Sequence, residues 1–401
     1  MEYKENVLLK DKHILICLEE DNDNTNANLY YLKTNFCGKV LTEIDKNLIT
    51  PNRIIYLCGN INKIYDTIKD IKLKIIFVIK ELSNNYDEPS EKYEIINIGL
   101  VPINIHNVGI YFRKFFNSKD YFNLIKSEHE FQLLTESNKP NHALRKGIYL
   151  TKVEQDGDEL KFNLLRCSSN LTGSTDNFRT TDYEIINKIN DFSQYFFKEK
   201  IELNHVLAQI YENSDKGKAA IKAHSDKTKD MKKKALIAFC TFYDDGLYNG
   251  KIKKSKTDMF DYCYNKTSVL TRLHFKLKPM VKDPNLKKEF NIILYPNSVF
   301  IIPLSTNRLY THEIKPSILP YDILPTRLGY VVRCSKTKAI FKNNQTYIIE
   351  NGDYRNLEEI NKDNAPELRK LYYEENVTDK IIDYGFVNFS FNKGDNLRPN
   401  L

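Results

Sequence analysis

The sequence predicts an α+β protein in which a strand-rich antiparallel unit follows a small α/β unit. Two observations lead to this prediction. Short β-branched runs alternate with helix-like stretches in the first 105 residues, and eight apolar-alternating runs follow one another between residues 201 and 342. Hydrophobic residues make up 41% and charged residues 28% of the 401 positions, which is typical of a folded globular chain long enough for two or three domains.

Residues 1–105 are expected to form a small α/β domain with crossover connections between its strands. The strand candidates are the short apolar runs at 13–18, 53–58, 74–80 and 93–98. Neither of the glycine-rich phosphate-binding patterns, GxGxxG and GxxxxGK[ST], occurs in this region. We therefore interpret it as a structural or docking unit rather than a nucleotide-binding domain, and the sequence names no protein partner for it.

Residues 106–345 are expected to form the second and larger domain. It begins with a strand, a turn and a helix capped near Ser118. A strand-and-loop region follows at 145–182, and then a helix over roughly 182–198. The eight strand-like runs come next, and so many runs in one block are typical of an antiparallel barrel or sandwich.

The last segment, 346–401, is charged and partly helical, with a strand-like run at 385–391, and it is expected to pack on the larger domain. No apolar run approaches the ~18–20 residues that a membrane crossing needs, and the N-terminus does not resemble a secretory signal. The seven cysteines form no CxxC pair, which disfavours a disulfide framework and a zinc–thiolate site. We expect no membrane association and an intracellular location, cytoplasmic or nuclear.

Three features of the strand-rich block indicate metal chemistry. His224 and Asp226 are two residues apart, so on a strand or its end their side chains point to the same face. His312 lies in a later strand-like run, and Arg327 and Arg333 are six residues apart on another. Two histidines and one carboxylate make the facial triad of non-haem Fe(II) oxygenases, which leaves three coordination positions open. An arginine fork suits the distal carboxylate of the cosubstrate 2-oxoglutarate.

The runs that carry these residues resemble, in the same order, the AlkB branch of the 2-oxoglutarate- and Fe(II)-dependent dioxygenases. They are LNHVLAQIY (203–211), AHSDKTKD (223–230), RLYTHEI (308–314) and RLGYVVR (327–333). The resemblance spans roughly 108–342, about 235 of the 401 residues. It implies a double-stranded β-helix, or jelly-roll, as the catalytic domain behind the small α/β domain. It also implies hydroxylation of a C–H bond with Fe(II), 2-oxoglutarate and O2.

Carried over residue by residue, the resemblance makes His224, Asp226 and His312 the catalytic iron ligands. Arg327 would clamp the distal carboxylate of 2-oxoglutarate, and Arg333 would lie by the carboxylate nearer the metal. His224 and Asp226 taken alone would be weaker evidence for a metal site, because a His-x-Asp pair is common by chance.

Three further positions and one interval bear on the cosubstrate and on departures from the family. Tyr211 matches the family tyrosine that hydrogen-bonds 2-oxoglutarate, and Gln209, on the same strand face, stands where the family commonly has asparagine. Gly329 stands where some members place a polar residue between the arginines. The interval from Asp226 to the second histidine is longer than in compact members, and the surplus is expected in 244–290.

The sequence leaves the substrate open. The resemblance favours oxidative demethylation of alkylated nucleic acid, but a hydroxylase of a protein side chain or of a small molecule would use the same residues. A third interpretation is a catalytically inactive binding module on the same fold. The formal net charge of +7 permits a polyanionic partner such as nucleic acid without requiring one.

Two segments are candidates for contact with a nucleic acid. Lysines that follow the His-x-Asp pair either line the mouth of the site and contact phosphates or lie in a solvated loop; they are Lys227, Lys229, Lys232, Lys233, Lys234, Lys251, Lys253, Lys254 and Lys256. The segment 145–150 lies where AlkB-like proteins place a substrate lid. Arg145, Lys146 and Tyr149 would contact a nucleotide there, unless the segment is an ordinary strand with a basic start. The polar stretch 168–182 is either a lid or a surface loop.

Overall fold

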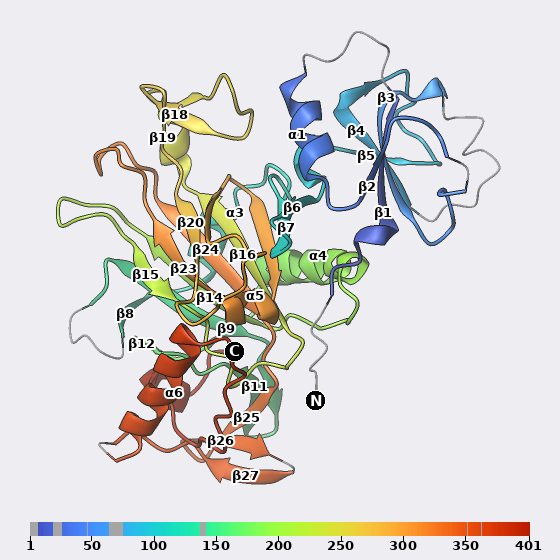
Figure 1. Ribbon diagram of the computed structural model, residues 1–401. Coiled ribbons are helices and arrows are strands. Elements are labelled where there is room, and N and C mark those ends of the chain that lie inside the picture. Colours follow the sequence, from blue (N-terminus) through green and yellow to red (C-terminus); the bar gives the residue numbers. More distant parts are fainter. Residues whose placement is uncertain are drawn as a thin grey trace.

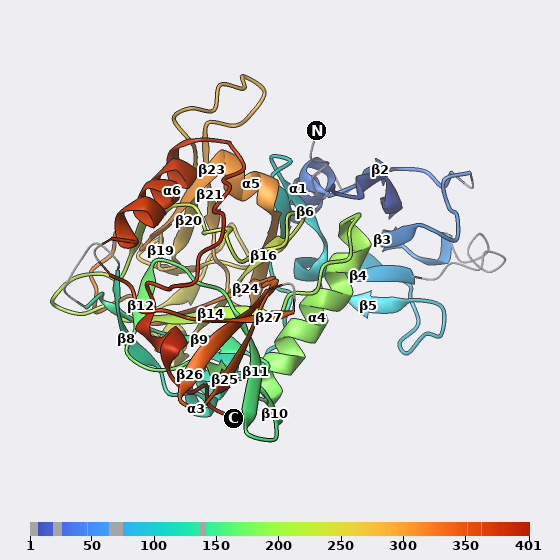
Figure 2. The ribbon, with the colours of Figure 1, turned by 90° about the horizontal axis from the view of Figure 1, so that it is seen from below.

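The computed structural model describes residues 7–18, 26–45, 47–63, 75–136, 142–350, 352–361 and 363–401. The strands of these segments form five sheets. A parallel sheet (blue in Figure 1) lies to one side of a strand-rich body, and the C-terminal segment (red) lies on the other side. Figure 2 shows the same arrangement from below. None of the helices within the described segments is both long and apolar enough to cross a membrane.

The parallel sheet contains the four runs that the sequence marks as strands. Its order is β2-β1-β3-β4-β5, and every neighbouring pair is parallel. The strands are β1 (His13–Leu18), β2 (Lys39–Leu41), β3 (Ile54–Asn60), β4 (Ile75–Asn84) and β5 (Glu94–Ile96), with η1 (Lys10–Lys12) before β1 and α1 (Ala27–Asn35) after it. The strand β2 was not predicted, because its three residues are too few to show an alternating pattern.

Both faces of the parallel sheet are buried. Alternate residues of a strand point to opposite faces: Ile14 and Ile16 pack in a core of the sheet's own, whereas Leu15 and Cys17 pack in the core that continues into the strand-rich body. Because one face shares its core with that body, a separately folding N-terminal domain remains a prediction.

The strand-rich body contains a large and a small antiparallel sheet. The large one has the order β12-β8-β9-β14-β24-β16-β22-β7-β6, with β13 paired in parallel to β9. Its strands are β6 (Ile103–Ile105), β7 (Gly109–Phe112), β8 (Gln132–Glu136), β9 (Arg145–Thr151), β12 (Ser169–Leu171), β13 (Asp176–Asn177), β14 (His205–Tyr211), β16 (Leu236–Tyr243), β22 (Ser298–Pro303) and β24 (Arg327–Arg333). The small sheet has the order β15-β23-β20-β21 and consists of β15 (Ile221–His224), β20 (Arg272–Leu277), β21 (Glu289–Ile293) and β23 (Tyr310–Lys315).

The two antiparallel sheets pack face to face around an aromatic core. The Phe239 ring of β16 in the large sheet lies 5.2 Å from the His312 ring and 6.5 Å from the Phe275 ring of the small sheet, centroid to centroid. Each of the eight runs predicted between residues 201 and 342 overlaps one of the strands β14, β15, β16 and β20–β24. Two facing antiparallel sheets with few helices are consistent with a jelly-roll oxygenase fold.

The two helices predicted in this body lie near their expected positions, as α3 (Tyr121–Glu128) and α4 (Thr180–Phe196). Two short helices, η2 (Ile98–Leu100) and α5 (Leu304–Leu309), were not predicted. The N-cap of α3 is Asp120, whose side chain accepts a hydrogen bond from the Asn123 amide, so the expected cap at Ser118 is wrong by two residues. Aspartate satisfies a free helix N–H group and also complements the helix dipole.

A buried ion bridge joins the end of α3 to the start of α4. His129 donates from both ring nitrogens, to Asp176 at 2.7 Å and to Asp182 at 2.8 Å, and Tyr330 of β24 also donates to Asp182 at 2.7 Å. Burial alone would lower the pKa of His129, but the two carboxylates raise it to about 9. Although Glu128, His129 and Asp182 are close enough together to hold a metal ion, both histidine nitrogens are already occupied by protons. We interpret the group as structural.

The C-terminal segment shares a sheet with strands that precede residue 346. A third antiparallel sheet has the order β10-β11-β25-β26-β27 and consists of β10 (Glu154–Asp156), β11 (Glu159–Leu164), β25 (Thr337–Lys342), β26 (Gln345–Glu350) and β27 (Asp353–Asn356). The expected boundary therefore passes through the β25–β26 hairpin. The helices α6 (Ala365–Val377) and η4 (Lys393–Asn396) follow. The predicted strand at 385–391 is wrong: this stretch forms only a single bridge, at Phe389.

The surplus residues between the metal-site motifs have two roles. Residues 244–270 form a projection with η3 (Asp245–Tyr248), β17 (Lys253–Lys254), β18 (Tyr262–Tyr264) and β19 (Thr267–Ser268), seen at the top of Figure 1. The rest of 244–290 includes β20 and the first residues of β21, which belong to the small sheet.

Candidate metal centre and cosubstrate cavity

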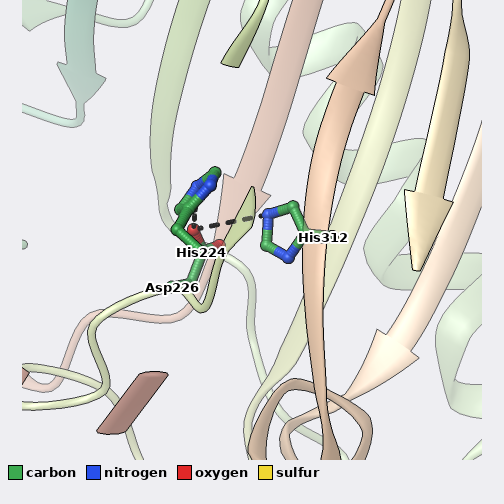
Figure 3. A group of neighbouring side chains, drawn as sticks. All are labelled: His224, Asp226 and His312. Atoms are coloured by element: carbon green, nitrogen blue, oxygen red, sulfur yellow. Dashed lines mark ion pairs between the residues drawn. The ribbon is translucent and has the colours of Figure 1, made fainter. Parts of the chain in front are cut away.

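The predicted metal ligands come together at one end of the small sheet. His224 is the last residue of β15 and lies opposite His312 of the antiparallel neighbour β23. Asp226 follows in the loop, and its Oδ1 lies 3.9 Å from Nε2 of each histidine. The three ligand atoms lie within 4.8 Å of one another, and Figure 3 shows the side chains pointing toward a common centre. Pairing in the sheet thus brings together residues that are 86 or more positions apart in the chain.

Hydrogen bonding sets His224 in the form that a metal needs. Its Nδ1 lies 2.8 Å from the Lys222 carbonyl oxygen, and a carbonyl can only accept, so Nδ1 must carry the proton. The Nε2 lone pair is then free to face Asp226, as in metal sites where a backbone carbonyl orients the ligand. His312 also presents Nε2, while its Nδ1 is buried with no partner among the described residues.

The charges of the three side chains suit a divalent cation. Burial lowers the pKa of His224, and it lowers the pKa of His312 to about 3, so both imidazoles are neutral at pH 7. Burial would raise the pKa of Asp226, but Arg333 outweighs it and holds this pKa below its usual value. Neutral histidine and ionised aspartate are the forms that coordinate metals, and this donor set fits Fe(II).

Arg333 lies on the metal ligand itself. Its Nε donates to Asp226 Oδ2 at 2.9 Å and its Nη2 donates to Oδ1 at 3.1 Å. Both side chains are 5% exposed. This two-point contact fixes the plane of the carboxylate and compensates its charge in a buried site. The expected role of Arg333 beside the 2-oxoglutarate carboxylate nearer the metal stays a prediction.

Arg327 is buried, and no acidic side chain among the described residues pairs with it. It is 3% exposed, and its guanidinium carbon stacks 4.0 Å from the centroid of the Tyr211 ring. Nε and Nη2 are buried and have no hydrogen-bond partner within the described part of the chain. An unpaired buried charge is costly, so this guanidinium is set up to receive an anion. A carboxylate of 2-oxoglutarate fits that requirement in charge and in geometry.

Gly329 makes room for this arrangement. A Cβ atom at position 329 would lie 2.9 Å from Nη1 of Arg327 and 3.3 Å from Cε2 of Tyr211. The glycine at this position therefore has a steric reason. On the neighbouring strand, the Tyr211 hydroxyl donates to Oε1 of Gln209 at 3.1 Å, which keeps both polar groups beside the guanidinium.

All seven predicted site residues line one cavity of about 510 Å³, within the usual size range for a small-ligand site. Among the described residues, Asp226 is the only carboxylate in its wall, and the remaining charged residues are Arg145, Lys222, Lys227, Arg327, Arg333 and Arg369. The cavity is therefore strongly cationic before a metal binds. It also includes Arg369, Tyr372, Tyr373 and Asn376 of α6, which the sequence did not indicate because no motif or spacing connects this helix to the metal ligands.

The interpretation that the lysines contact phosphates at the mouth of the site is wrong for Lys227 and Lys229. Lys227 is 6% and Lys229 is 8% exposed. Lys227 donates to the Tyr372 carbonyl at 3.0 Å, and Lys229 pairs with Asp230 at 3.1 Å. The partner of Lys227 is distant in sequence and that of Lys229 is adjacent, and both ammonium groups are buried away from solvent. None of the other lysines in the predicted set lines the cavity, and Lys254 of the projection lines a separate one of about 340 Å³.

The segment 145–150 is an ordinary strand, and only its first residue reaches the cavity. It lies within β9, between β8 and β14. Tyr149 is 2% exposed and packs in an apolar cluster with Leu134 and Leu207, so its ring cannot stack on a substrate. Lys146 lies 3.5 Å from Glu212, and Arg145 lines the cavity. In the stretch 168–182, the only residues lining the cavity are Ser168 and Ser169.

No protein-family model matches the sequence, and no curated protein matches it. Among solved structures, the chain is similar to OsALKBH1, with 11% identity and a TM-score of 0.34 over 56% of this chain and 97% of that one. It is also similar to a prolyl-4-hydroxylase from Pseudomonas putida, with 9% identity and a TM-score of 0.31 over 56% of this chain and 91% of that one. At this level of similarity, neither protein identifies a family for this chain.

Proposed function

We propose that the protein is an Fe(II)- and 2-oxoglutarate-dependent dioxygenase that hydroxylates a C–H bond. The observation that carries the proposal is the presence, in one cavity, of the His224–Asp226–His312 donor set, of which Asp226 and His312 are buried, and of the buried Arg327, which has no counter-ion among the described residues. When bound in such a site, iron supplies the O2-dependent oxidation that is coupled to decarboxylation of 2-oxoglutarate.

The residues of the chain have separate tasks in this proposal. The two histidines and Asp226 would hold the metal as its three protein ligands. Arg333 keeps the Asp226 carboxylate ionised and fixes its plane. Arg327, held against Tyr211, receives the distal carboxylate of 2-oxoglutarate. The apolar walls around His312, including Phe239 and Leu273, limit the access of water to the site.

For the substrate we propose an alkylated nucleic acid, from which hydroxylation of an N-methyl group releases formaldehyde. The cationic cavity supports this proposal. A second groove of about 500 Å³ adjoins it and shares Arg145 and Lys222 with it. This groove adds Lys218 and Lys315, against one carboxylate, Glu313. Tyr373 lines the cavity and is 68% exposed, which leaves its ring available for stacking on a base.

The test is release of formaldehyde from an N-methylated single-stranded oligonucleotide in the presence of Fe(II), 2-oxoglutarate and ascorbate. The same oligonucleotide without the methyl group is the control. We expect formaldehyde in equimolar amount to succinate, and an oligonucleotide affinity that falls steeply with salt. Tyr373→Ala should weaken the stimulation of turnover by the oligonucleotide. The background turnover measured without oligonucleotide should stay unchanged.

Other outcomes separate the alternatives. Succinate formation that does not respond to the oligonucleotide would reject the nucleic-acid substrate and favour a protein side chain or a small molecule. Absence of turnover with every oligonucleotide, protein extract and metabolite tried, while metal and 2-oxoglutarate bind, would favour an inactive binding module.

A further inference from the structure

The loop that presents Asp226 is held by the C-terminal helix. This loop, residues 225–228, begins where β15 ends. The Asn376 side-chain oxygen accepts hydrogen bonds from the Ser225 amide at 2.8 Å and from Lys227 Nζ at 2.9 Å. One helix residue thus contacts both neighbours of the predicted metal ligand.

Glu375 makes a second attachment to the same loop. Its Oε1 accepts from the Thr228 amide at 3.1 Å and from the Thr228 hydroxyl. Glu375 is 5% exposed, and its other carboxylate oxygen accepts from the Tyr384 hydroxyl. A buried carboxylate with this many donors has little freedom to move.

The opposite side of the loop is held by α5. Asn307 accepts from the Asp226 amide at 2.9 Å and donates to the Asp226 carbonyl at 2.9 Å. The amides of residues 225, 226 and 228 are therefore all bonded to side chains. The backbone that aims the Asp226 carboxylate depends on α5 and α6 for its conformation, because no strand of the described segments pairs with it there.

Cations from the strand-rich body fix the end of α6 against this loop. Lys227 donates to the Tyr372 carbonyl at 3.0 Å, and Lys278 donates to the Glu375 carbonyl at 2.5 Å. Carbonyl groups at the C-terminal end of a helix carry partial negative charge, so positive side chains stabilise this position. Lys278 is itself among the large side chains that are fully buried.

We propose that Asn376, with Glu375 beside it, is a positioning residue of the metal centre, so that the C-terminal helix is part of the machinery that holds the metal. The inference rests on the proposed function for the identity of the centre. Its physical basis is that the backbone at 225–227 sets the direction of the Asp226 side chain. Asn376 accepts hydrogen bonds from the residues on both sides of Asp226. Residues that orient metal ligands without touching the metal change affinity by about 10–100-fold when they are removed.

The test is a titration of the full-length chain with Co(II), followed by its visible absorption, for wild type and three variants. We expect Asn376→Ala to weaken Co(II) binding at least about 10-fold. Asn376→Asp keeps an acceptor oxygen at the same place and should bind Co(II) at least as tightly as wild type. Lys370→Ala, at an exposed position of the same helix, should not change the affinity.

The outcomes distinguish this inference from the proposed function. Unchanged Co(II) affinity in Asn376→Ala, with wild type binding normally, overturns the inference alone. Failure of wild type to bind Co(II) overturns the proposed function and this inference with it. If Asn376→Ala does not fold, Thr228→Val, which removes only the hydroxyl bonded to Glu375, is titrated in its place. A weaker Co(II) affinity supports the inference, and an unchanged one overturns it.

Discussion

Arg333 donates two hydrogen bonds to Asp226, while Arg327, six residues earlier on the same strand face, has no acidic partner within the described residues. The two arginines are almost equally buried, at 4% and 3% exposure. Arg333 forms an ion pair within the folded protein, and we assign Arg327 to the binding of a ligand. The difference leads to opposite expectations for the two alanine variants.

Arg333→Ala should destabilise the metal-free protein by about 3–5 kcal/mol, because it leaves the Asp226 carboxylate buried and unpaired. The measurement is the free energy of unfolding in urea. Arg327→Ala is the matched control and should be neutral or stabilising, since it removes a buried charge that has no partner. Equal destabilisation by the two changes would contradict the assignment of Arg327 to a ligand.

Arg327→Ala should instead raise the apparent KM for 2-oxoglutarate by about 10–100-fold, the equivalent of losing a hydrogen-bonded contact to a charged group. Arg327→Lys keeps the charge without the fork and should recover part of this loss. Steady-state succinate formation at varied 2-oxoglutarate concentration checks the prediction. An unchanged KM would show that the cosubstrate carboxylate binds elsewhere.

Gly329→Ala should also raise the KM for 2-oxoglutarate, by moving the arginine rather than removing it. The added methyl group would lie 2.9 Å from Nη1 of Arg327, so the guanidinium must shift from its present position over the Tyr211 ring. Because glycine at this position has no left-handed backbone conformation to preserve, the melting temperature should change little. A fall in melting temperature with unchanged KM would refute this explanation of the glycine.

The His129 bridge predicts a pH dependence of stability that is independent of the metal site. The folded-state pKa of His129, about 9, is above the ordinary value of 6.5. Its contribution is therefore fully present below pH 6.5 and is lost as the pH rises through 9.

The free energy of unfolding, measured across this pH range, should fall more steeply for wild type than for His129→Gln. The comparison of the two proteins is needed because burial lowers the pKa of Lys278 to about 7 and of Lys229 to about 8, so that both titrate in the same range. Parallel pH profiles would contradict the ionic form of the bridge.

The sequence predicted the parts of the site that depend on regular spacing. Residues 224 and 226 at a strand end, and 327 and 333 on one face, follow from the two-residue period of a strand. The strand pairing that sets His224 opposite His312 was implied only by the family resemblance. What the sequence did not indicate depends on contacts between distant segments. Lys227 appears solvated in the sequence and is buried because α6, some 145 residues later, supplies its partners.

The most direct test of the central claim is succinate formation from 2-oxoglutarate by the purified full-length chain with Fe(II), ascorbate and air. We predict turnover in wild type that requires added Fe(II) and O2, and none in His224→Ala or His312→Ala. Both variants should keep the melting temperature of the metal-free protein within a few degrees. Turnover that persists in either variant, or wild type that binds Fe(II) and 2-oxoglutarate together and still forms no succinate with any substrate, would contradict the account.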